Sequence, residues 1–458
     1  MIQLIRLLNS HLSKFIGDVV GTATSKERLK RLIAISLYRN AFYLAADYLA
    51  LPATGFVFWM IAARFYHAED VGLASATIAA MGLLAILSAL GLNFGLIRFL
   101  PRSAKDANYM VNTSLTMAGL ASIVSGGIFL AGLSSWSPTL IFLRQNAIYL
   151  AAFLVFTVCS TLATMVDSTC IAHRRAGFSL ARGLIFGLSR LPLAVLLAAF
   201  FHSFGIFASW GVCQAVSIAI SALFFLPRIQ PGYRPFPTIS KSILSEMAHF
   251  SFTNYLVNLF WSLPNFVLPI MVLNILGAEL NAYFYIAWSI GNLLGVIPLS
   301  ISMSLFAEGS YDEQRLYADT WRSLKLTFLI IIPSVILIVI IADKLLLLFG
   351  SSYSHSGTTL LRILTLSALP IAINYIYIGK KRVEKKMAVL IKLSVFIAIA
   401  TLTLSYLLLP RMGIDGAGVA WLGSQGVVAL WIVTSFLLRR PAVRERWRRF
   451  TACLRRAR

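Results

Sequence analysis

Long apolar stretches recur along almost the whole chain, and polar residues gather in the short segments between them. Each stretch holds about 20 residues, the length at which a helix crosses ~30 Å of hydrocarbon. The stretches are apolar all round, whereas the strands of a membrane barrel alternate apolar and polar positions. The pattern predicts an all-α integral membrane protein of about 12 transmembrane helices, at residues 41–63, 71–98, 109–133, 147–167, 181–201, 204–227, 248–274, 281–306, 324–342, 357–379, 388–409 and 414–438.

The composition agrees with this pattern. Hydrophobic residues make up 59% of the 458 residues and charged residues only 12%, and the mean hydropathy is +0.81. A soluble domain carries about 25% charged residues, so most of this chain is expected to avoid bulk water. The net charge of +23 does not indicate nucleic-acid binding, because a basic footprint needs a soluble face that this chain has no room for.

The distribution of the 40 Lys and Arg residues predicts the orientation. Cytoplasmic segments of membrane proteins are enriched in these residues. With the N-terminus inside, Arg190 and Arg362 fall within spans, and only four cations fall in the outer loops: Arg64, Arg144, Lys344 and Arg411. Both termini are therefore predicted to be cytoplasmic, and the bias accounts for the net positive charge.

The two ends of the chain carry amphipathic patterns. Residues 1–40 mix apolar positions with Arg6, His11 and Lys14, which favours a helix on the membrane surface over a signal peptide; a disordered tail is the alternative. Residues 439–458 place Val443, Trp447, Phe450 and Leu454 on one helical face among arginines. This basic tail is expected to lie on anionic lipids of the inner leaflet, with a nucleic-acid arm as the less favoured alternative.

A duplication is visible when the two halves are compared. Three pairs of markers lie in equivalent loops, and the residue numbers within each pair differ by nearly the same amount: Ala68-Glu69 with Ala278-Glu279, Arg174-Arg175 with Lys380-Lys381, and Gly205-Ile206 with Gly413-Ile414. They predict two parallel six-helix lobes, at 41–227 and 248–438, joined by a proline-containing cytoplasmic linker at 228–247. Coincidence between similar loops is the alternative.

Polar residues at membrane depth are the candidates for function, because an ionisable group in hydrocarbon usually faces a cavity or a partner. The chain shows no nucleophile elbow, P-loop, nucleotide-binding glycine run, metal-ligand spacing or CxxC pair, so no catalytic residue, metal or cofactor is predicted. The alternative for each candidate is a helix-to-helix bond or an anchor at the headgroups. The candidate substrate-binding residues are Asp47, Arg98, Arg190, Asn258, Asn292 and Arg362.

Glycines spaced four apart occur in three predicted spans, as Gly91-x-x-x-Gly95, Gly183-x-x-x-Gly187 and Gly291-x-x-x-Gly295. Small residues at this spacing allow helix backbones to approach closely. We interpret them as packing positions.

The stretch from Gly55 to Arg102 resembles the opening hairpin of the O-antigen flippase-like branch of the multidrug/oligosaccharidyl-lipid/polysaccharide exporter superfamily. The similar pieces are Ala62-Ala63-Arg64, Val71-Gly72-Leu73-Ala74, Leu90-Gly91-Leu92 and Arg98-Phe99-Leu100-Pro101. Leu361-Arg362-Ile363-Leu364, Leu369-Pro370 and Gly413-Ile414-Asp415-Gly416-Ala417-Gly418 resemble the second half of that family. The similarity covers roughly residues 35–438, and the motifs are degenerate and apolar.

The resemblance implies two six-helix lobes around a central cavity in the bacterial inner membrane. It implies that an undecaprenyl-pyrophosphate-linked oligosaccharide moves from the cytoplasmic to the periplasmic leaflet, for O-antigen, lipopolysaccharide or exopolysaccharide synthesis. Cationic cavity residues would hold the pyrophosphate, and H⁺ or Na⁺ would drive the cycle. Glycosyltransferases and a glycan polymerase of the same pathway are the implied partners.

Two other functions fit a polytopic chain. A cation-coupled multidrug antiporter of the same superfamily should show more acidic residues in its spans, and the deep charges here are few and mostly basic. A membrane glycan polymerase or ligase needs an outer loop long enough to hold a catalytic site, and the predicted outer loops are short. The flippase is therefore preferred, and the protein is not expected to be an enzyme.

The charge bias yields a direct test of orientation. A reporter that is active only in the periplasm, fused after Arg458, should give no signal, because the tail is predicted to stay in the cytoplasm. Strong reporter activity from this fusion would reverse the assigned topology.

Overall fold

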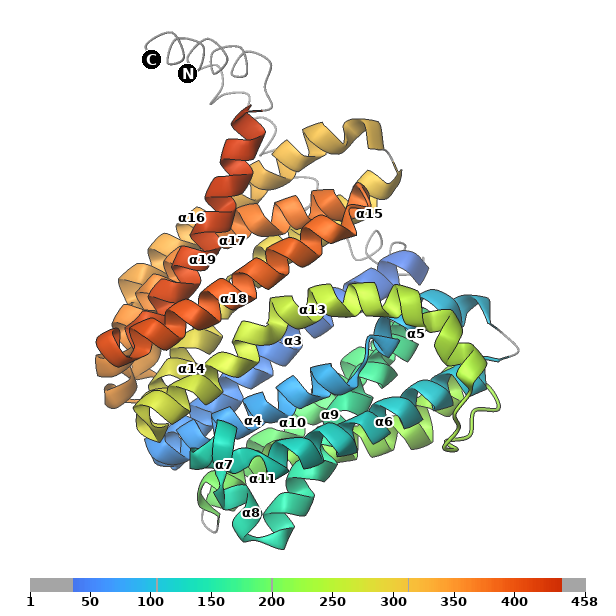
Figure 1. Cartoon of the computed structure of the whole chain (residues 1–458), viewed down its shortest axis with the longest axis horizontal. Coiled ribbons are helices and arrows are strands. Elements are labelled where there is room, and N and C mark those ends of the chain that lie inside the picture. The colour runs from blue at the N-terminus through green and yellow to red at the C-terminus, as the bar shows by residue number, and fades with distance from the viewer. Residues whose placement is uncertain (1–35, 104–105, 199–200, 312, 439–458) are drawn as a thin grey trace, which may run out of the picture.

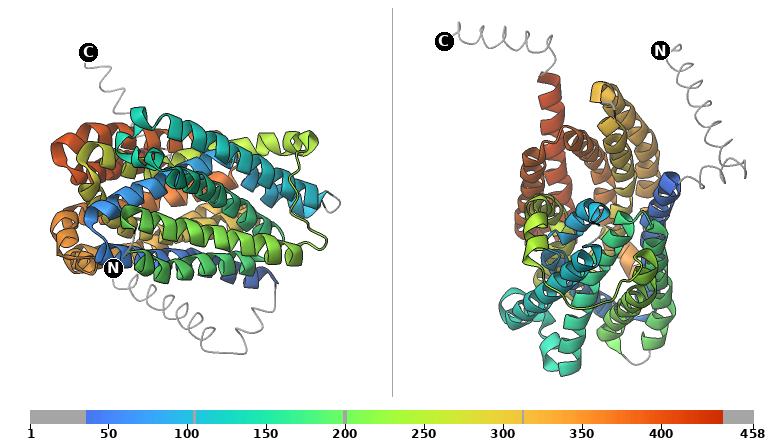
Figure 2. Two further views of the ribbon diagram at one scale, coloured as in Figure 1. Left: turned by 90° about the horizontal axis from the view of Figure 1, so that it is seen from below. Right: turned by 90° about the vertical axis from the view of Figure 1, so that its right-hand side faces the viewer.

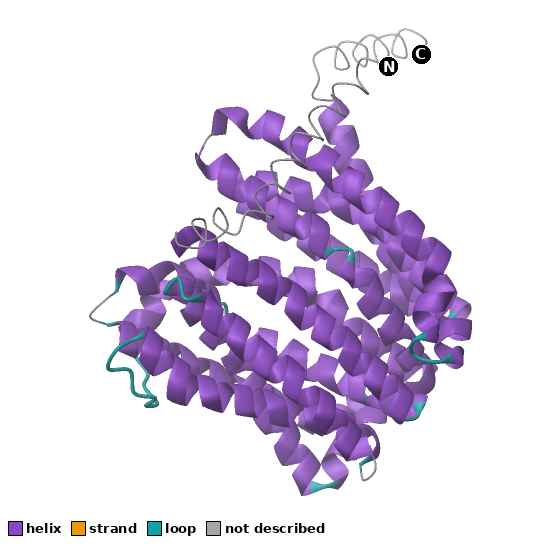
Figure 3. Ribbon diagram, turned by 180° about the vertical axis from the view of Figure 1, so that it is seen from behind, coloured by secondary structure: helices purple, strands orange, loops and turns teal. Residues whose placement is uncertain are grey.

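A computed structural model describes residues 36–103, 106–198, 201–311 and 313–438. Every regular element in these ranges is a helix (Figure 3). The first 35 residues of the predicted N-terminal surface segment and the predicted basic tail at 439–458 lie outside the described part of the chain.

The first half of the chain supplies the elements up to residue 229. They are α3 (Ser36–Phe65), α4 (Ala68–Ser88), α5 (Leu92–Phe99), η1 (Leu100–Arg102), α6 (Ala107–Ala131), α7 (Leu133–Trp136), η2 (Pro138–Leu140), α8 (Phe142–Gln145), α9 (Ala147–Ala172), α10 (Ala176–Ala198), α11 (His202–Ile220), the π-helical turn η3 (Ser221–Phe225) and α12 (Leu226–Ile229).

An irregular segment at 230–240 leads into the second half. Its elements are α13 (Lys241–Leu276), α14 (Ala278–Leu293), α15 (Val296–Tyr311), η4 (Glu313–Arg315), α16 (Leu316–Leu347), α17 (Ser351–Val383), α18 (Met387–Met412) and α19 (Ile414–Leu438). The predicted linker at 228–247 thus contains the end of α12, this irregular segment and the first turns of α13.

Eleven segments of the described chain are long and apolar enough to cross a membrane, and α3 adds a shorter apolar stretch at Leu49–Phe65. Each of the predicted spans corresponds to one of these segments. The prediction of an all-α membrane protein with about 12 spans is therefore confirmed.

Two predicted spans are interrupted. The span 71–98 breaks between α4 and α5, where Leu90 and Gly91 have φ values of 50° and 74°. The span 281–306 breaks at Leu294 and Gly295, between α14 and α15, because Pro298 lacks the N–H that would bond to the Leu294 carbonyl in a continuous helix. We interpreted Gly91-x-x-x-Gly95 and Gly291-x-x-x-Gly295 as packing positions, and the structure shows that the helix breaks also occur in these two segments.

The two halves form two helix bundles that meet at one end and diverge toward the other (Figures 1 and 2). Helix α13 of the second half packs on α18 of its own half and also lies along α4 and α5 of the first half. A side chain on Gly91 would overlap the backbone of Ser251, and one on Gly82 would overlap the ring of Phe266, so these glycines permit the close approach.

Polar contacts join the bundles at the end where they meet. Arg64 donates from Nε to the carbonyl of Leu348 and from Nη2 to the carbonyl of Leu347, each at 2.9 Å. These carbonyls lie at the C-terminal end of α16, where the helix leaves acceptors free and favours a cation. The sequence predicted this end to be the outer one.

Two asparagines add to the same junction. Asn281 donates to the Gly72 carbonyl at 2.7 Å and to Ser75 Oγ at 3.2 Å. Asn274 accepts from the hydroxyls of Thr139 at 3.1 Å and Ser137 at 3.3 Å. The junction is therefore fixed by a small number of hydrogen bonds as well as by apolar packing.

Gly72 offers a test of this packing. A Cβ at Gly72 would overlap the carbonyl oxygen of Ala278, and backbone can give way only by separating α4 from α14. Gly72→Ala should therefore lower the free energy of unfolding by about 1–3 kcal/mol, the usual cost of overpacking. The measurement is unfolding of the purified protein in detergent.

Gly127→Ala is the matched control, because nothing lies within 4 Å of a Cβ at Gly127 and alanine suits a helix better. Equal stability of the Gly72 and Gly127 variants would contradict the packing described here.

Candidate functional site

A cavity of about 380 Å³ lies between the two halves of the protein. Helices α3, α10 and α11 line it from the first half, and α13, α14 and Phe349 line it from the second. Eight of the 18 residues that line it are aromatic. The rings belong to Phe56, Trp59, Phe186, Trp210, Phe266, Tyr285, Trp288 and Phe349.

Arg190 is the one charged residue among those lining this central cavity. Its side chain comes from the middle of α10 and is only 1% exposed. The guanidinium carbon lies 4.3 Å from the ring centre of Trp210, 4.5 Å from Phe186 and 4.9 Å from Phe58. Such cation–π contacts partly compensate for the loss of water around the charge.

The guanidinium keeps unused hydrogen-bond donors. Arg190 Nε and Nη1 are buried and have no hydrogen-bond partner in the described part of the chain. Buried donors are nearly always paired, so the two unpaired N–H groups leave this cation able to bind an anion. A phosphate or a carboxylate entering the cavity would satisfy both the charge and the donors.

Amide side chains supply the neutral polar groups of the cavity. Asn292 of α14 donates from Nδ2 to Asn265 Oδ1 of α13 at 3.3 Å, and both residues line the cavity together with Ser289. Amides and hydroxyls can exchange hydrogen bonds with the hydroxyl groups of a sugar.

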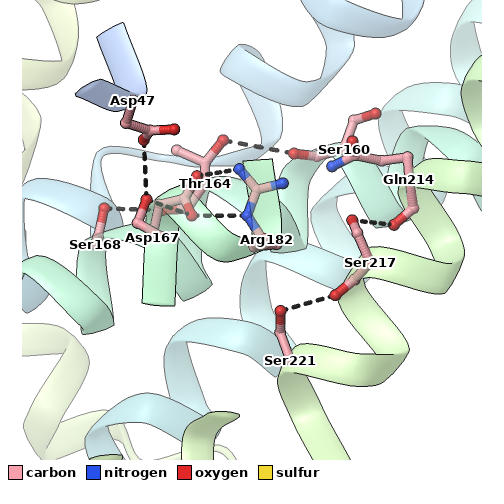
Figure 4. Close-up of polar contacts among 10 residues, drawn as sticks. Asp47, Ser160, Thr164, Asp167, Ser168, Arg182, Gln214, Ser217 and Ser221 are labelled. Carbon is pink, nitrogen blue, oxygen red and sulfur yellow. Dashed lines mark hydrogen bonds and ion pairs between the residues drawn. The ribbon is translucent and has the colours of Figure 1, made fainter. Parts of the chain in front are cut away.

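A second polar cluster joins α3, α9 and α10 (Figure 4). Arg182 donates from Nε to Asp167 Oδ1 at 2.7 Å and from Nη2 to Asp167 Oδ2 at 2.5 Å. The Ser179 hydroxyl lies 3.0 Å from Asp167 Oδ1 and 3.2 Å from Asp47 Oδ2, so it can donate its single hydrogen to either carboxylate. With both carboxylates ionised, this four-residue cluster carries one excess negative charge.

Glycines place the cluster and the cavity on one helix pair. A Cβ at Gly183 would come within 2.8 Å of Asp47 Oδ1, and one at Gly187 within 2.5 Å of Thr54 Oγ1. The spacing Gly183-x-x-x-Gly187 thus lets α10 pack closely on α3, as small residues do in membrane helices.

The structure brings together some of the residues predicted for the site. Arg190 and Asn292 line the central cavity, and Asp47 belongs to the cluster beside Asp167. Arg98 is exposed on α5, with its guanidinium carbon 4.1 Å from the ring centre of Phe250. Arg362 is exposed and donates to the Val339 carbonyl at 3.2 Å, which ties α17 to α16. Asn258 is half-buried on α13 and does not line the central cavity.

Sequence reasoning missed Arg182. It lies two turns into α10, near the predicted boundary of a span, where an arginine is expected to reach the headgroups. Ser179 and Gly183, three residues before it and one after it, were the available signals, because they put a hydroxyl and a close helix contact next to the cation.

Removal of Arg182 should strongly destabilise the protein. Arg182→Met leaves Asp167 without its bidentate partner beside Asp47. Because the Asp167 side chain is 25% exposed, the cost should be about 2–3 kcal/mol, at or below the lower end for a fully buried ion pair. Unfolding in detergent measures the loss.

The control for this variant is Arg322→Met. Arg322 pairs with Asp319 on the surface and its side chain is 79% exposed, so its removal should cost less than about 1 kcal/mol. A similar loss of unfolding free energy in both variants would show that the ion pair of Arg182 and Asp167 contributes no more to stability than a surface pair.

Comparisons with solved structures place the fold. The lipid II flippase MurJ in an inward closed conformation is similar with a TM-score of 0.70 and 13% identity, over 86% of this chain and 87% of that one. A multidrug resistance MATE family transporter of the MOP superfamily matches in its inward-facing conformation with a TM-score of 0.65 and 14% identity, over 89% of this chain and 99% of that one. Its outward-facing conformation gives a TM-score of 0.54 and 15% identity, over 87% and 96% of the two chains.

Sequence comparison identifies the family. No curated protein matches the chain. The profile of the family described as "Polysaccharide biosynthesis protein" matches residues 37–306, which is more than half of the chain. The chain thus belongs to the polysaccharide biosynthesis protein family and is a multi-pass membrane protein with the fold of MOP-superfamily transporters.

Proposed function

We propose that this membrane transporter is a flippase that moves a lipid-linked oligosaccharide, carried on undecaprenyl pyrophosphate, across the bacterial inner membrane by alternating access. The observation that carries the proposal is Arg190, a buried cation with unpaired donors in the central cavity. The family match to polysaccharide biosynthesis and the fold similarity to a lipid II flippase support it.

The cavity suits the head of such a substrate. Arginine can grip phosphate oxygens with two parallel hydrogen bonds and stays protonated at any relevant pH. The aromatic walls offer apolar faces to sugar rings, and Asn265 and Asn292 offer donors and acceptors to their hydroxyls. A volume of about 380 Å³ admits only the part of the substrate near the pyrophosphate, so the polyprenyl chain would remain in the bilayer.

The arrangement of the two halves supports an inward-facing state. The polar contacts of Arg64, Asn274 and Asn281 join the bundles at the predicted outer end, and the bundles diverge toward the other end (Figure 1). The chain is also more similar to the inward-facing than to the outward-facing MATE transporter. Release to the periplasmic leaflet would require the contacts at the outer end to break.

The cluster around Asp47 is the proposed coupling point for H⁺ or Na⁺. Asp47 and Asp167 share the hydroxyl of Ser179, and the one arginine of the cluster, Arg182, pairs with Asp167, so a single added cation would neutralise the excess charge. Because Asp47 and Arg190 lie on the packed pair α3 and α10, a change in the cluster can reach the cavity through helix movement. Glycosyltransferases and a glycan polymerase of the same pathway remain the proposed partners.

A multidrug antiporter is the second candidate function, because MATE transporters share the fold. The charge of the central cavity argues against it. Arg190 is the only charged residue among the described residues that line the cavity, and its positive field would repel a cationic drug and attract an anion.

Substitutions of the arginines test the proposed function. Arg190→Ala should abolish export of surface glycan at unchanged protein level, and Arg190→Lys should restore part of it, because lysine keeps the charge but loses the planar fork. Arg98→Ala and Arg362→Ala should reduce export less, because both side chains are exposed and neither lines the central cavity. Arg411→Ala, an exposed residue at the end of α18, is the control and should export normally.

Normal export from Arg190→Ala would remove the pyrophosphate site and with it the main support for the flippase. Proton exchange that depends on added cationic drugs, measured in vesicles, would favour the antiporter instead.

A further inference from the structure

A second and larger cavity, of about 680 Å³, lies wholly within the C-terminal half. It is a groove formed by α16, α17 and α19, at the end of these helices that was predicted to be cytoplasmic. It shares no lining residue with the central cavity, so the proposed translocation site does not account for it.

Aromatic rings form the walls of this groove. Phe436 of α19 faces Tyr317 and Trp321 of α16, with ring centres 5.8 and 5.7 Å apart. On the other side Tyr377 of α17 meets Trp431 of α19 at 6.2 Å. Tyr317 and Trp431 are 53% and 48% exposed, so the groove is open on the outside of the bundle. Aromatic residues gather in this way where a membrane protein meets the headgroup region.

Two lysines lie at the polar end of the groove. Lys380 Nζ is 5.9 and 5.7 Å from the ring centres of Tyr317 and Phe436, and Lys381 Nζ is 5.2 Å from that of Tyr377. They belong to the end of α17, where Lys380, Lys381, Arg382, Lys385 and Lys386 surround a single acid, Glu384.

Glu384 compensates for only part of this charge. Its carboxylate lies 2.6 Å from Lys381 Nζ, 3.1 Å from Lys386 Nζ and 3.9 Å from Lys380 Nζ. Burial works to raise the pKa of Glu384, but the hydrogen bonds with Lys381 and Lys386 outweigh it and lower that pKa below its usual value. The carboxylate is therefore ionised at neutral pH, and residues 380–386 beside the groove together hold five cations and one acid.

We propose that the groove between α16, α17 and α19 binds an anionic phospholipid, with its phosphate at Lys380 and Lys381 and its acyl chains along the aromatic walls. The charge complementarity and the position at a helix end are those of basic pockets that hold anionic lipid headgroups. The separation from the central cavity sets this lipid apart from the transported substrate.

Native mass spectrometry of the full chain in detergent tests the proposal, with phosphatidylglycerol and zwitterionic phosphatidylethanolamine added in equal amounts. The double variant Lys380→Gln, Lys381→Gln should lower bound phosphatidylglycerol about tenfold, because each lysine near the headgroups attracts anionic lipid. Bound phosphatidylethanolamine should change less than about twofold. The control Lys325→Gln, Lys392→Gln removes the same charge from exposed positions outside the groove and should bind like the parent.

A second variant keeps the lysines and fills the groove. Ser435 lines it with a small side chain, so Ser435→Trp should also displace phosphatidylglycerol while the unfolding temperature stays near that of the parent. Three results would overturn the proposal: equal loss of both lipids in the lysine variant, unchanged phosphatidylglycerol in Ser435→Trp, or a co-purified polyprenyl-linked lipid that these variants displace in place of phosphatidylglycerol.

Discussion

The buried cation at Arg190 is the constraint around which the middle of this protein is built. A charge at membrane depth costs several kcal/mol unless its surroundings compensate for it. Among the described residues the compensation comes from the faces of Phe58, Phe186 and Trp210 and not from a carboxylate, and two donors stay unpaired. An ion pair would have neutralised the site permanently. An aromatic cage holds the cation in place and leaves its field available to an anion that enters and leaves.

The sequence could predict the spans and Arg190 for the same physical reason. Hydrocarbon thickness fixes the length of an apolar helix, and an arginine in the middle of such a helix is costly enough to stand out. Arg182 was not predicted, because its position near the boundary of a span fits two arrangements. Its side chain could reach the headgroups, or it could turn inward to Asp167, as the structure shows. Arg362 was predicted as a site residue from its depth in the span, but depth does not determine which face of α17 a residue occupies. In the structure Arg362 donates a hydrogen bond to the Val339 carbonyl.

The contacts that join the two bundles suit a change of conformation. Arg64, Asn274 and Asn281 form hydrogen bonds at one end, and each such bond contributes about 1 kcal/mol net, or somewhat more where a charge takes part. A handful of bonds of this size can be replaced by others at the opposite end, so the two arrangements would differ by only a few kcal/mol. Inside the first bundle, in contrast, the bidentate ion pair between the buried Arg182 and the partly exposed Asp167 is more costly to break.

The two arginines of α10 therefore have opposite electrostatic roles on one rigid element. Eight residues separate Arg182 from Arg190, which is roughly 12 Å along a helix. The charge of Arg182 is paired with Asp167, next to Asp47. Arg190 faces the cavity, and two of its N–H donors have no partner in the described part of the chain. Close glycine contacts bind α10 to α3 at both levels, at Gly183 near the cluster and at Gly55 near Arg190. A cation that changed the charge around Asp47 would shift the balance of forces on this helix pair, and the pair would carry that shift to the Arg190 guanidinium, which we propose holds the anion.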